Sequence, residues 1–366
     1  MSAEHKLHLA VTGAMGVDKV SNSTISKCVS AASRLVGHFS HSLLATTELE
    51  KRQQQMGVLG ENGQPLRLVQ FVKTRWNSVH DMFQRLVKLR WPVVAVLSDR
   101  AVVKQSDAKT LDMRDEYWSL MSDLLPVLQP LQIVTELLCA EKSTSASVVY
   151  PLMYKLVNVD MAEADGDSAT IRDFKRDVSK ALDDRFALSK AETARHPFVS
   201  ATVLDPATKG CDLFTAEIRA AAYEHVRGLV DATPPPDEHT PANELVEETS
   251  PPPPKRAKAD PRTASLKFLQ STAASPSPSQ EFDRYLAAPA DDHATDALQW
   301  WAANAQFYPA TARIARQYLS VPATSAQSER QFSAAGRLIS KLRSRLDPDR
   351  VDTIIFLYEN LGNLKA

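Results

Sequence analysis

The residues best suited to chemistry lie in a helix-forming stretch near the C-terminus. Thr324 and Gln327 form a capping-box pattern, which predicts that a helix starts there. Past this start, Glu329 shares its helical face with Ser333 and Gly336, which are both small. A large ligand could therefore approach the Glu329 carboxylate closely.

A basic stripe lies beside this acid on the same predicted helix and consists of Arg330, Arg337 and Lys341. One acid next to a basic stripe is what a metal-dependent phosphodiester site could use. The alternative is an ordinary amphipathic core helix with a solvated acid, because apolar residues also recur at steps of three and four. These apolar positions are Phe332, Ala335, Ile339, Leu342 and Leu346.

The stretch over residues 321–337 resembles the C-terminal signature of hAT-superfamily transposases, usually described as the hAT dimerisation region. The likeness extends upstream and downstream in the same order as in the family. It covers residues 298–301, 308–309, 314–322, 342–346 and 355–361.

The resemblance implies a catalytic domain like ribonuclease H, in which three acids hold two divalent ions for cutting DNA. Glu329 matches the family's glutamate, whereas the two aspartates and a zinc-binding DNA domain would lie before Met1. A metal at Glu329 is therefore expected only if those aspartates are present, with Mg²⁺ or Mn²⁺ for the full-length enzyme and no cofactor for the chain as given. Because one carboxylate cannot hold two magnesium ions against water, we expect these residues alone not to cleave DNA.

A second stretch with possible chemistry follows a predicted strand. Residues 66–72 alternate and are rich in branched side chains, which favours a strand. Thr74 is expected to cap the helix after it, and Arg75 and Trp76 either pack at that helix start or bind DNA. hAT transposases have a similar Thr-Arg-Trp-Asn-Ser block, whose tryptophan position is associated with stacking on an unpaired base.

Helical periodicity extends over much of the remaining chain, including residues 25–44, 79–89, 148–159 and 174–188. Residues 117–139 predict two helices or one kinked helix, because Pro126 and Pro130 interrupt them. The expected fold is mostly α with a few short strands: a partial ribonuclease-H-like α/β core with a large helical insertion.

Composition and resemblance together predict four segments. They are a remnant of the ribonuclease-H-like core (1–90), a helical insertion region (91–231), a disordered Pro/Ser-rich linker (232–280) and the hAT C-terminal dimerisation region (281–366). Within the linker, Lys255, Arg256 and Lys258 follow a proline run and are either a nuclear-import signal or a solvated charge run.

Self-association is expected through aromatic and apolar residues of the last segment. The predicted dimerisation residues are Trp300, Trp301, Phe332, Ile339, Leu342, Ile355 and Leu357. The expected partners are a second copy or a higher oligomer and DNA, without a membrane, and the expected location is the nucleus.

The overall composition says little about partners. The 366 residues have a net charge of −1, so any affinity for nucleic acid must come from local basic patches. Three cysteines without paired spacing give neither a disulfide framework nor a zinc site. Three functions stay open: a transposase-derived protein that dimerises and binds DNA, the C-terminal part of an active transposase, and an interaction scaffold.

Overall fold

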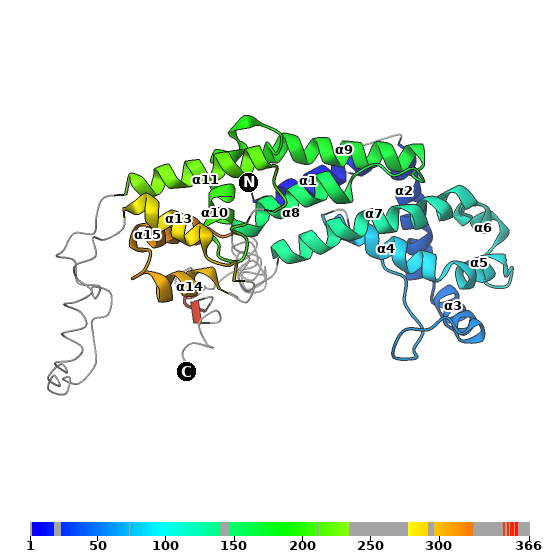
Figure 1. Cartoon of the computed structure of the whole chain (residues 1–366). Coiled ribbons are helices and arrows are strands. Elements are labelled where there is room, and N and C mark those ends of the chain that lie inside the picture. The colour runs from blue at the N-terminus through cyan, green and yellow to red at the C-terminus, as the bar shows by residue number, and fades with distance from the viewer. Residues whose placement is uncertain are drawn as a thin grey trace. The chain divides into compact units, whose positions relative to one another are not determined.

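A computed structural model of the chain describes most of its residues (Figure 1). They are residues 2–17, 23–72, 74–139, 146–210, 212–233, 277–291, 296–324, 347, 350, 352–354 and 356–357. The described residues divide between two compact units: unit 1 comprises Met1–Thr193 and Pro322–Ala366, and unit 2 comprises Ala194–Val321.

Helices make up unit 1. They are α1 (Ala3–Met15), α2 (Thr24–His41), α3 (Leu43–Met56), α4 (Asn77–Lys88), α5 (Arg90–Ser98), α6 (Gln105–Leu111), α7 (Asp115–Cys139), α8 (Val149–Lys155) and α9 (Ala169–Phe186), with short helical turns at Ala146–Val148, Leu156–Asp160 and Ala191–Arg195. The core forms where α1 packs on α9 and α4 packs on α7 (Figure 1).

Local sequence signals fix the ends of several of these helices. The hydroxyls of Ser2, Ser23 and Ser42 accept hydrogen bonds from backbone N–H groups in the first turns of α1, α2 and α3. Gly16 and Gly57 end α1 and α3 in the left-handed conformation, each with a φ of 67°. The predicted helices at 25–44 and 174–188 are confirmed as α2 and α9. The stretch with Pro126 and Pro130 forms one helix, α7.

The predicted strand at 66–72 is wrong. The segment is extended but has no strand partner, and the described residues form no sheet. Helix side chains supply its hydrogen bonds instead. The Gln53 side chain accepts from the Leu66 N–H at 2.7 Å and donates to the Leu66 carbonyl at 2.9 Å. At the other end, the Ser78 hydroxyl accepts from the Val72 N–H at 2.9 Å.

The few short strands of the expected fold are thus absent from the described residues, which are mostly helical. Alternation and branched residues predicted the extended backbone correctly. They could not show whether another strand lies beside it, and that depends on tertiary structure. A ribonuclease-H-like core is not confirmed.

Unit 2 is also helical and brings together residues from both sides of the predicted linker. Its helices are α10 (Pro197–Leu204), α11 (Ala216–Asp231), α13 (Pro278–Ala287), α14 (Ala297–Asn304) and α15 (Pro309–Leu319). Helix α11 precedes the linker and packs against α13, which follows it. Arg227 pairs with Asp283, and the Ser279 hydroxyl donates to the Asp231 carboxylate. Residues 194–233 and 277–321 therefore fold together.

Buried side chains tie the helices of unit 2 together by binding helix ends. The Trp301 indole N–H donates to the Leu204 carbonyl at the end of α10, at 2.7 Å. The Lys209 ammonium donates to the Tyr285 and Ala288 carbonyls at the end of α13, at 2.6 Å each. These bonds satisfy terminal carbonyls that have no partner within their own helix, and the ammonium also complements the negative end of α13.

Glu281 does the same for the start of α15. Its carboxylate is buried and accepts from the Thr311 N–H at 2.7 Å and from the Ala310 N–H at 3.3 Å. Because a helix N-terminus is partially positive, the carboxylate is stabilised there. Glu281 thus connects α13 to α15. In the same way, Lys209 connects the loop between α10 and α11 to α13.

We predict that Gln53→Ala loosens the extended segment, because the part-buried N–H and carbonyl of Leu66 both lose their partner. The free energy of unfolding of unit 1 should fall by about 1–3 kcal/mol, and the Leu66 amide should exchange faster. Gln54→Ala is the matched control, since Gln54 is exposed on the same helix. Urea denaturation together with amide hydrogen exchange tests this. Equal behaviour of the two variants would mean that Gln53 does not hold the segment.

Candidate nucleic-acid and self-association surfaces

The predicted catalytic acid and its basic stripe cannot be placed. Glu329, Arg330, Arg337 and Lys341 lie outside the described residues, as do Lys255, Arg256 and Lys258 of the predicted import signal. Within the described ranges, no group of three or more His, Cys, Asp or Glu side chains could hold a metal ion.

The Arg-Trp block starts α4, and its two named residues lie in different environments. Trp76 occupies the N-cap position of α4 without a side-chain capping bond, so Thr74 is not the cap that the sequence predicted. The Trp76 side chain is 1% exposed and its indole N–H has no hydrogen-bond partner among the described residues. Arg75 is exposed. In this conformation Trp76 packs in the core and only Arg75 faces solvent, so base stacking by Trp76 would require it to move.

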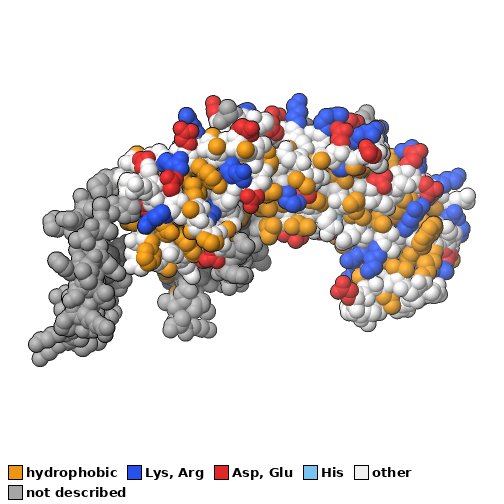
Figure 2. Space-filling model, in the orientation of Figure 1, with side chains coloured by type: hydrophobic (Ala, Val, Ile, Leu, Met, Phe, Trp, Pro, Cys, Tyr) orange, Lys and Arg blue, Asp and Glu red, His pale blue; other side chains and the backbone are white. Residues whose placement is uncertain are grey.

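The residues around this block are locally basic although the whole chain is nearly neutral. Residues 62–104 contain eight basic side chains and only two acidic ones. The basic ones are Arg67, Lys73, Arg75, Arg85, Lys88, Arg90, Arg100 and Lys104, and the acids are Asp81 and Asp99. Figure 2 shows Lys and Arg side chains beside exposed hydrophobic ones in the part of unit 1 that holds α4 and α5.

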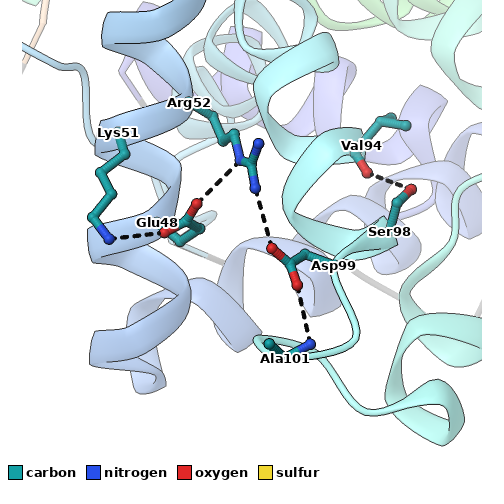
Figure 3. A network of polar contacts seen from close by, with 7 residues as sticks. All are labelled: Glu48, Lys51, Arg52, Val94, Ser98, Asp99 and Ala101. Atoms are coloured by element: carbon teal, nitrogen blue, oxygen red, sulfur yellow. Dashed lines mark hydrogen bonds and ion pairs between the residues drawn. The ribbon is translucent and has the colours of Figure 1, made fainter.

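Both acids of this basic region already have polar partners. Asp99 pairs with Arg52 of α3 at 3.1 Å, and its other oxygen accepts from the Ala101 N–H at 3.0 Å (Figure 3). Asp81 lies 3.3 Å from the His80 ring nitrogen. By contrast, five exposed basic residues form no ion pair within the described part of the chain: Arg67, Arg75, Lys88, Arg100 and Lys104. Their charge is available to an anionic ligand.

The predicted dimerisation residues separate into three groups. Phe332, Ile339, Leu342 and Ile355 lie outside the described residues. Trp301 is 2% exposed and is bound to Leu204, so it is a packing residue of unit 2, and Trp300 beside it is half-buried. Leu357 is exposed.

Unit 2 itself presents apolar surface that the sequence did not single out. Leu298, Phe307 and Val321 are exposed, and Phe307 is 57% exposed. Beside Leu298, α14 and α15 enclose a hollow of about 230 Å³, lined by Leu298, Trp301, Ala302, Ala312 and Arg316. Leu298 is thus both exposed and part of the lining of this hollow.

Two further findings concern the described helices and the C-terminal region. None of the described helices has the length and apolar content needed to cross a membrane.

Residues 281–361 match the hAT family C-terminal dimerisation region. The matched range begins in α13, at Glu281, and includes α14, α15 and the exposed apolar residues of unit 2.

Curated proteins with similar sequences are transposases and zinc finger proteins. The "Putative AC transposase" of Zea mays is 35% identical over 79 residues, which is 21% of this chain and 10% of the relative. The human "Zinc finger BED domain-containing protein 4" is 24% identical over 302 residues, covering 80% of this chain and 24% of the relative. The mouse "Zinc finger BED domain-containing protein 6" is 24% identical over 373 residues, covering 93% of this chain and 36% of the relative.

The chain thus spans from about a tenth to somewhat over a third of the length of these relatives. The matched dimerisation region contains the motif residues of the sequence analysis, and the match to the transposase has a higher identity than those to the zinc finger proteins. Residues 281–361 of this chain thus match the hAT family C-terminal dimerisation region, and the chain is similar in sequence to transposases and to BED zinc finger proteins.

Proposed function

We propose that this protein associates with itself through its C-terminal region and binds DNA in the nucleus, and that these 366 residues alone do not cleave DNA. The observation that carries the first part is the match of residues 281–361 to a dimerisation region. The same range contains the exposed apolar surface of unit 2 and the hollow between α14 and α15. A second copy would cover apolar area that is otherwise left in water.

DNA binding is supported by the basic region at 62–104 and by the transposase named among the relatives. Arg75, Arg67 and Lys88 would contact phosphates, since phosphate contacts need charge but no particular base. Arg330, Arg337 and Lys341 stay in the proposal as further contacts, whereas Trp76 would contact DNA only after leaving the core. The nuclear location rests on the basic cluster after the proline run, with the solvated charge run as its alternative.

The proposal that DNA is not cut rests on the acids. Of the three that the family uses, only Glu329 has a counterpart here, and Mg²⁺ or Mn²⁺ would need further ligands to bind there. The alternative is an active cut-and-paste transposase of which these residues are the C-terminal part, favoured by the match to a putative transposase. Such an enzyme would use Glu329 as its third acid.

A plasmid-nicking assay distinguishes a chain that does not cut DNA from an active transposase. Incubated with supercoiled plasmid and Mg²⁺ or Mn²⁺, the chain should leave the plasmid supercoiled, because one carboxylate does not form the metal site. Gel electrophoresis measures the nicked fraction. Nicking that disappears in Glu329→Ala would overturn the proposal and favour the active enzyme.

For self-association, we predict that Phe307→Asp raises the dimer dissociation constant at least tenfold, or about 1.4 kcal/mol, because a charge replaces an apolar contact. Sedimentation velocity across micromolar concentrations measures it. Leu43→Asp is the matched control: Leu43 is 82% exposed but lies outside the matched range. An unmodified chain that is monomeric at every concentration would contradict self-association itself.

For DNA, we predict that removing both Arg75 and Lys88 weakens duplex binding and reduces its salt dependence. Each lost phosphate contact should lower the slope of log affinity against log salt by about one. Fluorescence anisotropy at several salt concentrations measures this. The control changes Lys180 to alanine together with Lys190, two exposed lysines outside the basic region, and so removes the same total charge. If both double variants bind alike, α4 is not the DNA surface.

For the nuclear location, residues 250–263 fused to a cytosolic reporter should move it into the nucleus, since the basic cluster would be read by the import machinery. The same peptide with Lys255, Arg256 and Lys258 changed to alanine is the control. Fluorescence microscopy gives the result. A reporter that stays in the cytosol with the unmodified peptide would favour the solvated charge run.

A further inference from the structure

Trp91 is the feature of the basic region that packing does not explain. Its side chain is 66% exposed at the start of α5, whereas Trp76, Trp118 and Trp301 are buried and Trp300 is half-buried. Leaving so much aromatic surface in water forgoes the free energy that burial would provide. An exposed tryptophan therefore calls for a partner that covers its ring.

The Trp91 ring does not stand alone on the surface. The Arg90 guanidinium carbon lies 5.0 Å from the centre of the Trp91 ring and 5.4 Å from that of the buried Trp118 ring. Arg90 is fixed in turn by Asp115, whose carboxylate lies 2.6 Å from the guanidinium. Arg90 thus lies within cation–π distance of both the exposed Trp91 ring and the buried Trp118 ring of α7.

The charge around Trp91 indicates what kind of ligand would cover it. Lys88 lies three residues before it, and Arg100 and Lys104 follow in the same basic region. The two acids at the start of α7 have basic partners: Asp115 binds Arg90, and Glu116 lies 3.6 Å from Arg114. A flat aromatic surface inside a basic region matches a ligand that combines phosphate charge with flat rings.

We propose that Trp91 is a stacking platform for an unpaired base of single-stranded DNA, with Arg90 as its positioning residue. This inference rests on the proposed DNA binding and adds a ligand class to it. Stacking on an aromatic side chain tolerates every base, because each base has a π-face, and neighbouring Lys and Arg follow the phosphates. A duplex keeps its bases paired and stacked inside, so Trp91 contributes nothing to duplex binding.

The experiment compares a short fluorescein-labelled single strand with the same sequence as a duplex, by anisotropy, for the full chain. Trp91→Ala should weaken single-strand binding by roughly 5- to 150-fold, the range for losing one stacked base, and leave duplex binding unchanged. Trp91→Phe should recover most of the single-strand affinity, because it keeps an aromatic face. Melting temperatures should match, since the Trp91 side chain is mostly exposed.

Two arginine variants separate stacking from charge. Arg90→Lys keeps the charge but loses the planar contact with Trp91, so it should weaken single-strand binding more than duplex binding. Arg100→Ala is the matched control, because Arg100 belongs to the same basic region but contacts the Leu97 carbonyl at 3.0 Å rather than an aromatic ring. It should weaken both forms equally.

Each contrary outcome overturns a different statement. If Trp91→Ala binds the single strand as the unmodified chain does, while loss of Arg75 and Lys88 weakens both DNA forms, the stacking role is wrong and DNA binding stands. If the unmodified chain binds neither form at low salt, the proposed DNA binding fails. If Trp91→Ala changes sedimentation instead of DNA affinity, the ring contacts protein and the stacking role is wrong.

Discussion

The structure of unit 1 depends on how the backbone of one extended segment is satisfied. Helices pair their own N–H and carbonyl groups, whereas the segment at 66–72 needs partners from elsewhere. Buried Gln53 binds both backbone groups of Leu66, and Ser78 in the first turn of α4 binds Val72. These bonds fix where α4 begins. They thereby place Trp76 in the core and leave Arg75 in solvent, so the polar contacts of this segment decide which side chains a DNA strand could reach.

In unit 2 as well, side chains satisfy backbone groups that have no partner within their own helix. Trp301 of α14 binds the end of α10, and Lys209 of the loop after α10 binds the end of α13. Glu281 of α13 binds the start of α15. Burial lowers the pKa of the Lys209 ammonium, because desolvation penalises its charge. The matched dimerisation region begins in α13, but α13 packs on α11, which lies before the predicted linker. Residues 194–233 are therefore needed to position the first part of that region.

The features that could be predicted from the sequence are those that depend on residues close together in the chain. The hAT motif stretch was recognised from residues in order and agrees with the match at 281–361, and the helices α2 and α9 follow from their apolar periodicity. The strand was wrong because alternation predicts an extended backbone but not a neighbouring strand. The burial of Trp76 and Trp301 could not be predicted, since it depends on how the helices pack against each other. The local excess of basic residues at 62–104 is a sequence signal that could have indicated a binding surface near Trp91. The net charge of the whole chain, −1, does not reveal this excess.

The central claim is that DNA meets the surface of α4 and α5 and that Trp91, rather than Trp76, is the aromatic residue on it. Hydroxyl-radical footprinting read by mass spectrometry, with and without single-stranded DNA, tests this at each tryptophan in one sample. Trp91 should be oxidised rapidly in the free protein and be protected by DNA, while Trp76 should react slowly in both samples. Rapid oxidation of Trp76 that DNA suppresses, with Trp91 unaffected by DNA, would contradict it.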